Sequence, residues 1–295
     1  MQESKNKFIG RVNELVALRK LYHKKTSSII TIQGRRRIGK SRLIEEFAKG
    51  YRFLNFAGLA PNDVINAQDQ KHEFARMMSE QLSIPKVVSD DWGDLFSFLA
   101  KYTERGRVVI LFDEISWMAY KDKTFLSKLK NAWDLHFSKN PKLILVLCGS
   151  VSSWIDKNIL SSTSFIGRIA LSLTLNELSL GESIDFLNQL GFKKSFTEQF
   201  TVLSLTGGVP WYLELINPAY PANENIKDLC FTKSGVLVKE FENIFNDLFS
   251  SRTKIYKQIV KVLSKTSLTY KQLASVIDYP SGGPLSQYLD DLILA

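Results

Sequence analysis

The sequence has 295 residues, of which 44% are hydrophobic and 23% are charged, as in a globular protein with a packed core. Its net charge of +9 permits binding to nucleic acid or another anionic surface but does not establish it. The two cysteines and three scattered histidines exclude a disulfide framework and a histidine metal cluster, and no apolar run is long enough to span a membrane. We therefore expect a cytoplasmic protein without a membrane partner.

Strands and helices are predicted to alternate from residue 28 to about residue 175. Alternation of this kind predicts an α/β fold in which a parallel sheet is sandwiched between helices. Between the second and fourth of the expected strands, we expect helices at residues 73–82, 92–102 and 125–137. The apolar runs that we expect to form strands are residues 28–33, 51–58, 107–114, 142–150 and 169–175.

A glycine-rich loop follows the first of these strands and precedes a helical pattern. Gly34, four further residues, Gly39, Lys40 and Ser41 fit the phosphate-binding pattern G-x-x-x-x-G-K-[ST], and strand, loop and helix are the context that this pattern requires. Backbone N–H groups and the start of the helix would bind phosphate oxygens. Lys40 would contact the β- and γ-phosphates of ATP, and the Ser41 hydroxyl would be a ligand of Mg²⁺.

Three arginines occupy the variable positions of this loop. In such loops the main chain faces the phosphates, so solvated side chains are one interpretation of Arg35 and Arg36. The other is that an arginine contacts the γ-phosphate or the acidic face of a partner. For Arg37 we expect packing on a neighbouring acidic group. The residues expected to bind nucleotide in this segment are Gly34, Arg35, Arg36, Arg37, Ile38, Gly39, Lys40, Ser41 and Arg42.

Two carboxylates end the apolar segment RVVILFDE. Beside a phosphate loop this pattern indicates a Walker B element, in which Asp113 holds the Mg²⁺ shell. Adjacent residues at a strand end project differently, so Glu114 would orient and activate the attacking water. Asp113 and Ser41 are therefore the predicted metal ligands, and Glu114 the predicted general base.

Two further residues are candidates for catalysis. Ser150 ends the segment LILVLCGS, where it would either bond the attacking water or γ-phosphate or cap the next helix. Arg168 precedes the last predicted strand. It would either stabilise transition-state charge, in cis or across a subunit boundary, or be an ordinary surface residue.

No strand is expected after residue 175. We predict three domains: an α/β nucleotide-binding domain at residues 1–175, a helical lid at 176–220, and a winged-helix-like domain at 226–295. The stretch at 217–225 is rich in proline and asparagine, which indicates a linker. The last domain has the helical patterns of a helix-turn-helix unit, at 238–249, 253–264, 270–277 and 285–294, but lacks residues for a complete wing. Either the wing is absent or the chain is a truncated form of a longer protein.

These motifs, with the opening FIGRVNELVALRKL and the element TGGVPWYL, resemble the archaeal-type ATPases of the STAND class. That class is a branch of the P-loop NTPases related to AAA+ proteins. The resemblance implies that Phe8, Ile9, Gly10 and Arg11 lie near the adenine and that Pro210 approaches the nucleotide from the lid. The lid element TGGVPWYLEL contains no arginine of the kind that many AAA+ motors use as a second sensor, which favours a nucleotide switch.

The last predicted helix is poorly equipped to bind DNA. Its apolar stripe, Leu285, Leu289 and Leu292, would leave two aspartates but no lysine or arginine for solvent. Four lysines at 254, 257, 261 and 265 form a basic stripe on an earlier helix, which is typical of a solvated face. We therefore expect an ATP-binding, Mg²⁺-dependent, slow ATPase that acts as a switch on a protein partner or through self-association. The alternatives are a DNA-binding ATPase resembling archaeal replication initiators and, less favoured because Lys40, Asp113 and Glu114 are intact, a scaffold without activity.

Overall fold

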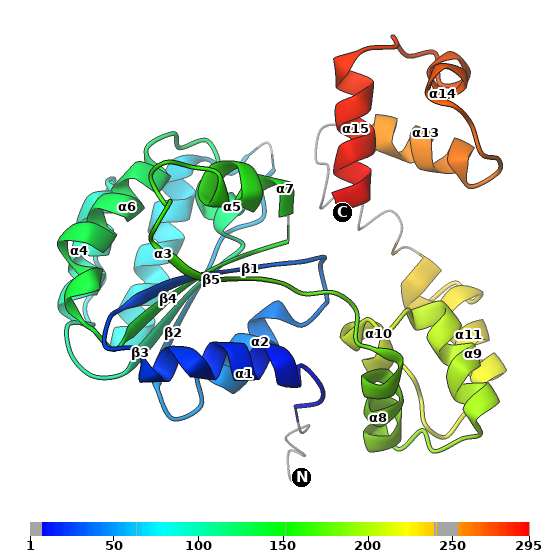
Figure 1. Cartoon of the computed structure of the whole chain (residues 1–295), viewed down its shortest axis with the longest axis horizontal. Coiled ribbons are helices and arrows are strands. Elements are labelled where there is room, and N and C mark those ends of the chain that lie inside the picture. Colours follow the sequence, from blue (N-terminus) through cyan, green and yellow to red (C-terminus); the bar gives the residue numbers. More distant parts are fainter. Residues whose placement is uncertain (1–7, 63, 151, 239, 241–252, 295) are drawn as a thin grey trace.

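The computed structural model describes residues 8–62, 64–150, 152–238, 240 and 253–294. They form an α/β domain, a second group of helices and a C-terminal group of helices that follow one another along the chain (Figure 1). Within the described part of the chain, no helix combines the length and apolar character needed to cross a membrane.

The sheet of the α/β domain has five parallel strands in the order β2-β3-β4-β1-β5. Strands β1 and β4 are buried along their whole length, because neighbouring strands and helices cover them on every side. The predicted strands are confirmed to within one residue at each end. Their bounds are β1 Ser28–Gln33, β2 Arg52–Ala57, β3 Val108–Asp113, β4 Leu143–Gly149 and β5 Ile169–Thr174.

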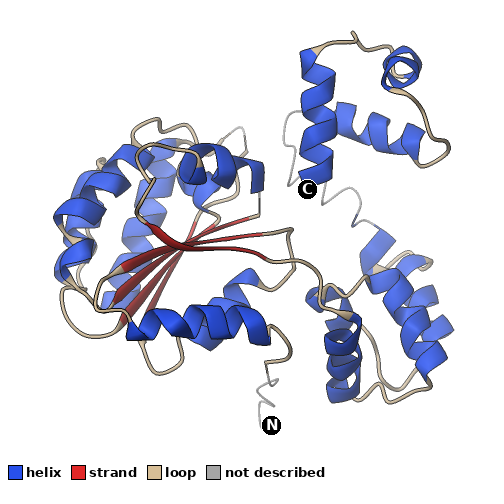
Figure 2. Ribbon diagram, in the orientation of Figure 1, coloured by secondary structure: helices blue, strands red, loops and turns tan. Residues whose placement is uncertain are grey.

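Helices cover both faces of this sheet, as Figure 2 shows. Successive side chains of a strand point to opposite faces, so β3 supplies Val109 and Leu111 to the core beneath α1 and α2, and Ile110 and Phe112 to the core beneath α3, α4 and α6. The two cores hold the sheet as a rigid support for the loops at its carboxyl edge. The helices of this domain are α1 Val12–Lys20, α2 Lys40–Phe47, α3 Ala67–Leu82, α4 Trp92–Lys101, α5 Ile115–Met118, α6 Phe125–Leu135 and α7 Ser152–Ile155, with short turns η1 Leu21–His23, η2 Phe137–Lys139 and η3 Asp156–Leu160.

Helix α3 starts six residues before the position predicted from its apolar spacing. Asn66 caps it: the Asn66 side chain accepts hydrogen bonds from the backbone of Gln68 and Asp69, and the Asp69 carboxylate bonds back to the Asn66 N–H. This reciprocal cap stabilises a polar first turn that has no apolar stripe of its own.

The second group of helices begins after β5, where the lid was predicted, and is called the lid below. It contains α8 Leu180–Leu190, α9 Phe196–Thr206, α10 Pro210–Glu214, α11 Ala222–Cys230 and the turn η4 Val236–Val238. The prediction of a linker at residues 217–225 is wrong, because α11 packs in the apolar core of the lid through Ala222 and Leu229. Asn225 is 2% exposed, and its amide exchanges hydrogen bonds with the backbone of Asn217. Asn217 and Asn225, whose residue type suggested a loop, bond to each other across a turn inside the lid.

The C-terminal helices are α13 Thr253–Leu263, α14 Tyr270–Val276 and α15 Gly283–Leu294, which share a small apolar core of their own. Leu285 is fully buried there, and Leu289 and Leu292 pack against it, as predicted. Asp291, predicted to face solvent, instead accepts a 2.5 Å hydrogen bond from the buried Tyr256 hydroxyl. The helix predicted at 238–249 lies, apart from Val238 and Glu240, outside the described residues, and residues 253–294 contain no strand.

Candidate nucleotide-binding site

The phosphate loop connects β1 to α2 and depends on its two glycines. Gly34 and Gly39 have φ values of +145° and +90°, a region that favours glycine. A Cβ atom on Gly34 would lie 2.4 Å from the carbonyl oxygen of Leu175. The loop can therefore pass this close to the end of β5 only with glycine at this position.

Lys40 begins α2 and points back into the loop. Its ammonium group donates hydrogen bonds of 2.9 Å to the Gly34 carbonyl and 3.1 Å to the Arg35 carbonyl, and the residue is only 6% exposed. These contacts place a buried positive charge inside the curve of the loop, at the N-terminus of a helix. Both features attract the oxygens of a phosphate.

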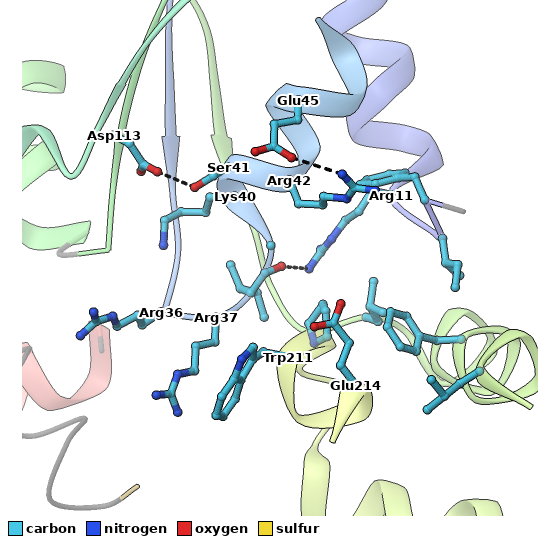
Figure 3. Close-up of a pocket in the computed structure, with 18 of the residues that line it drawn as sticks. Arg11, Arg36, Arg37, Lys40, Ser41, Arg42, Glu45, Asp113, Trp211 and Glu214 are labelled. Atoms are coloured by element: carbon cyan, nitrogen blue, oxygen red, sulfur yellow. Dashed lines mark hydrogen bonds and ion pairs between the residues drawn. The ribbon is translucent and has the colours of Figure 1, made fainter. Parts of the chain in front are cut away.

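Ser41 and Asp113 meet between the loop and the adjacent strand ends. The Ser41 hydroxyl donates a 2.5 Å hydrogen bond to Asp113 Oδ2 at the end of β3 (Figure 3). A hydroxyl and a carboxylate are the hard oxygen ligands that Mg²⁺ prefers, and Mg²⁺ commonly takes only one or two protein ligands beside water and phosphate oxygens. The pair fits a magnesium site, although no group of three or more His, Cys, Asp or Glu side chains able to hold a metal occurs in the part of the chain described.

Glu114 follows Asp113 in a left-handed backbone conformation, with φ of +50°. Its Oε2 atom accepts hydrogen bonds of 3.1 Å from the Ser150 N–H and 2.9 Å from the Ser150 hydroxyl. Ser150 follows β4, and β4 lies between β3 and β1 in the sheet. Ser150 therefore fixes the Glu114 carboxylate, which lines the cavity, and a bond from Ser150 to the attacking water or γ-phosphate stays a prediction.

The nearest thiol to these carboxylates is not a reactive one. Cys148 on β4 is fully buried. Burial raises the pKa of this thiol well above its usual range, and the nearby Asp113 carboxylate raises it further. A thiol in this state stays protonated and serves as a small apolar side chain.

A cavity of about 830 Å³ opens beside these residues, between the α/β domain and the lid. Its size suits a nucleotide. Of the residues predicted to bind nucleotide, Phe8, Ile9, Arg11, every residue from Arg36 to Arg42, and Pro210 line the cavity, together with Asp113 and Glu114. Pro210 also lies next to the loop, with its Cγ atom 3.8 Å from where a Cβ on Gly39 would be. Gly10, Gly34, Arg35, Ser150 and Arg168 are not part of the cavity wall.

Gly10 and Arg11 connect the opening segment to the loop and the lid. The Arg11 guanidinium donates to the carbonyls of Ile38, at 3.1 Å, and Asn176, at 2.5 Å, and the residue is 5% exposed. The Arg11 N–H bonds to Glu182 on α8 at 2.7 Å, and a Cβ on Gly10 would lie 2.8 Å from the same carboxylate. Arg11 therefore joins the phosphate loop to the lid on one side of the cavity.

The loop arginines each have a partner in the protein. Arg35 forms a 2.8 Å ion pair with Glu177, and both side chains are more than a third exposed. The Arg36 guanidinium lies 5.6 Å from the ring centroid of Trp117. The side chains of Arg35 and Arg36 therefore contact the protein, whereas one prediction had them solvated.

Arg37 makes the most buried contacts of the three. Its guanidinium lies 3.8 Å from the centre of the Trp211 ring in the lid and forms an ion pair with Glu240, whose side chain is 7% exposed. Glu240 also accepts a 2.8 Å hydrogen bond from the Tyr212 hydroxyl. Arg37 therefore packs on a neighbouring acidic group, and through it the phosphate loop contacts both α10 and the segment that follows η4.

Arg168 lies far from the cavity. Arg168 comes just before β5, whose first residue Ile169 pairs with Ile29 near the start of β1. The phosphate loop follows the end of β1, so Arg168 lies at the opposite edge of the sheet. Its guanidinium forms two 2.9 Å hydrogen bonds with the Asp134 carboxylate. A catalytic role in cis is inconsistent with this position, and a role across a subunit boundary stays a prediction.

Several cavity residues were missed by sequence reasoning. One, Glu45, comes from α2, and the others come from the lid: Leu178, Phe186, Gln189, Leu190, Trp211 and Glu214. On α8, Phe186, Gln189 and Leu190 share one face through their spacing of three and four residues, which is also the pattern of any amphipathic helix. Their role depends on where the lid sits against α2, and only the structure shows this.

The fold and the site together define a P-loop ATPase. Residues 8–216 match a family described as an ATPase domain predominantly from Archaea, and the chain belongs to this family. The chain is 24% identical over 290 residues to an uncharacterised protein of Methanocaldococcus jannaschii. That alignment covers 97% of this chain but 60% of the relative, so the chain spans less than two thirds of the relative's length.

Solved structures agree with the fold. A Walker-type ATPase of Pyrococcus abyssi superposes with a TM-score of 0.67 at 14% identity, covering 98% of this chain and 90% of the other. The ORC2 protein of Aeropyrum pernix, in complexes with ADPNP and ADP, superposes with a TM-score of 0.58 at 16% identity, covering 99% and 88%. At these identities the likeness is one of fold.

Proposed function

We propose that the chain binds ATP with Mg²⁺ and hydrolyses it slowly, as a STAND-type switch that acts on a protein partner or through self-association. The observation that carries this proposal is the direct contact between Ser41 and Asp113 beside the buried Lys40 ammonium. Ser41 and Asp113 would hold Mg²⁺, which neutralises charge on the phosphate oxygens when it is bound.

The chain's own groups would then act on the nucleotide in defined ways. Lys40 would leave its loop carbonyls and bind the phosphates, while backbone N–H groups of the loop hold their oxygens. Glu114, held by Ser150 at the edge of the cavity, would accept a hydrogen bond from the attacking water and take its proton. The lid, with Pro210 against the loop, would exclude bulk water from this step.

The switch role is favoured by the contacts of the loop arginines. Arg35 contacts the segment before α8, and Arg37 contacts α10 and Glu240, so a change in the phosphate loop reaches the lid directly. Titration calorimetry with ATP and ADP, and light scattering of the same samples, test the proposal. We expect micromolar binding of both nucleotides and a particle mass, or capture of a partner, that differs between them. Equal behaviour with ATP and ADP would contradict a switch.

A DNA-binding ATPase resembling archaeal replication initiators is the second candidate. It is supported by the superposition of 99% of the chain on the Aeropyrum pernix ORC2 protein and by the net charge of +9. The exposed Asp290 on α15 disfavours it. Anisotropy of a labelled DNA duplex, measured from about 50 to about 200 mM salt, distinguishes the two: an initiator-like protein binds with a steep salt dependence.

A further inference from the structure

Helix α10 places a carboxylate in the cavity wall, away from the phosphate end. Pro210 and Glu214 are four residues apart, so they lie on the same face of this short helix, and both line the cavity. Pro210 is the residue next to Gly39 of the phosphate loop. Glu214 therefore lies about 6 Å further along the helix axis than Pro210, just over one turn from the residue that contacts the phosphate loop. Figure 3 shows Glu214 directed from the lid toward the side of the cavity formed by α2.

The Glu214 carboxylate has acceptor capacity that the protein does not use. Among the residues that the structure describes, no donor forms a hydrogen bond or an ion pair with it. Surrounding protein atoms raise the pKa of Glu214, and Arg42 on the opposite wall opposes this effect in part. Arg42 itself donates a 3.3 Å hydrogen bond to Glu45. Glu214 is exposed, so solvent can satisfy it, and a ligand with neutral hydrogen-bond donors would replace that water at the carboxylate.

The chemistry of the site limits which part of a ligand can lie there. A carboxylate repels a phosphate, so Glu214 suits an uncharged donor of the nucleoside, either a ribose hydroxyl or the 6-amino group of adenine. The phosphates belong near Lys40 and Ser41, and the apolar side chains of Phe8 and Phe186 suit the base. The group that joins phosphates to base is the ribose, whose 2′- and 3′-hydroxyls are both donors.

We propose that Glu214 accepts hydrogen bonds from the ribose hydroxyls of ATP and thereby makes the site prefer ribonucleotides to 2′-deoxyribonucleotides. This inference rests on the proposed nucleotide binding and adds a specificity residue on the lid. It also makes lid closure depend on the sugar, because Glu214 belongs to α10 and the phosphates are held by the α/β domain.

Titration calorimetry of the whole chain with ATP, 2′-deoxy-ATP and inosine triphosphate, in Mg²⁺, tests the inference. We expect the parent chain to bind ATP about tenfold more tightly than 2′-deoxy-ATP, the effect of one hydrogen bond to a charged group at a solvent-accessible site. In Glu214→Ala this preference should fall to less than about twofold, through weaker binding of ATP. Glu224→Ala, which removes an exposed carboxylate on α11 outside the cavity, should keep the tenfold preference.

Two results would overturn the inference while leaving nucleotide binding intact. One is an equal affinity of the parent chain for ATP and 2′-deoxy-ATP. The other is a Glu214→Ala chain that keeps the ribose preference but loses discrimination between ATP and inosine triphosphate, which lacks the 6-amino group. In that case Glu214 would contact the base. A parent chain that binds none of the three nucleotides would instead contradict the proposed function itself, and this inference with it.

Discussion

At the scale of single residues, the site is a set of charged groups that hydrogen bonds from neighbouring residues hold in place. The Lys40 ammonium bonds to two carbonyls of its own loop, and Glu114 bonds twice to Ser150. Glu114 is thereby preorganised to meet water, the condition under which electrostatic catalysis is effective, whereas Lys40 would exchange its two carbonyl contacts for phosphate oxygens.

Lys40→Ala should weaken ATP binding by at least about tenfold, because a charge-assisted contact to phosphate is lost from a buried position. The fold should survive, since within the described part of the chain the Lys40 ammonium bonds to loop carbonyls and to no other group. Calorimetric affinity together with the circular dichroism spectrum measures both. A folded variant with the affinity of the parent chain would show that Lys40 does not face the phosphates.

Arg168 should keep the pKa of the Asp134 carboxyl low. Hydrogen bonds from Arg168, and then from Lys130, lower the pKa of Asp134 to about 2, so the pair stabilises the fold above about pH 4 and loses this effect as the pH falls toward 2. In Arg168→Ala the pKa of Asp134 should rise toward its ordinary value. Carboxyl-carbon NMR titration reports it directly, and an unchanged pKa would mean that the ion pair does not persist in solution.

At the scale of elements, the phosphate loop is joined to the lid through Arg37. A buried carboxylate that loses its cation is strongly destabilising. Arg35 forms a comparable pair with Glu177, but at the surface, where ion pairs contribute little. Substitutions of Arg35 and Arg37 therefore compare the contribution of an exposed ion pair to stability with that of a buried one.

Arg37→Ala should lower the free energy of unfolding by about 3 kcal/mol, because among the described residues Glu240 would keep its bond to Tyr212 alone. Arg35→Ala should lower it by less than about 1 kcal/mol. Urea unfolding measures both. Adding Glu240→Gln to Arg37→Ala should recover much of the loss, and equal effects of the two single substitutions would contradict the burial of the Arg37 pair.

Elements with a strong local signal were predictable from the sequence. The five strands are apolar runs, and the phosphate loop and Asp113 follow from patterns that specify their own backbone context. The error at residues 217–225 arose because asparagine favours loops in general, whereas Asn225 here bonds to a turn inside the lid core. The lid side of the cavity, Trp211 and Glu214 among it, depends on contacts between segments that are distant in sequence, and no local pattern encodes those.

At the scale of the whole molecule, the α/β domain and lid enclose the nucleotide cavity, and the C-terminal helices have a separate apolar core. The relative from Methanocaldococcus jannaschii is longer than this chain, which aligns with 60% of it. A cavity between the α/β domain and the lid suits the proposed switch, since a ligand that contacts both parts can alter the contacts between them.

The most direct test of this account is the ATP turnover of Glu114→Gln beside that of the parent chain, both at saturating ATP and Mg²⁺. The amide keeps the shape of the carboxylate but cannot accept the proton of the attacking water. We predict that Glu114→Gln binds ATP as the parent does and that its turnover is lower by about two orders of magnitude. Turnover equal to that of the parent would contradict the assignment of Glu114 as the catalytic base, and no turnover in either protein would contradict the assignment of this chain as a hydrolysing switch.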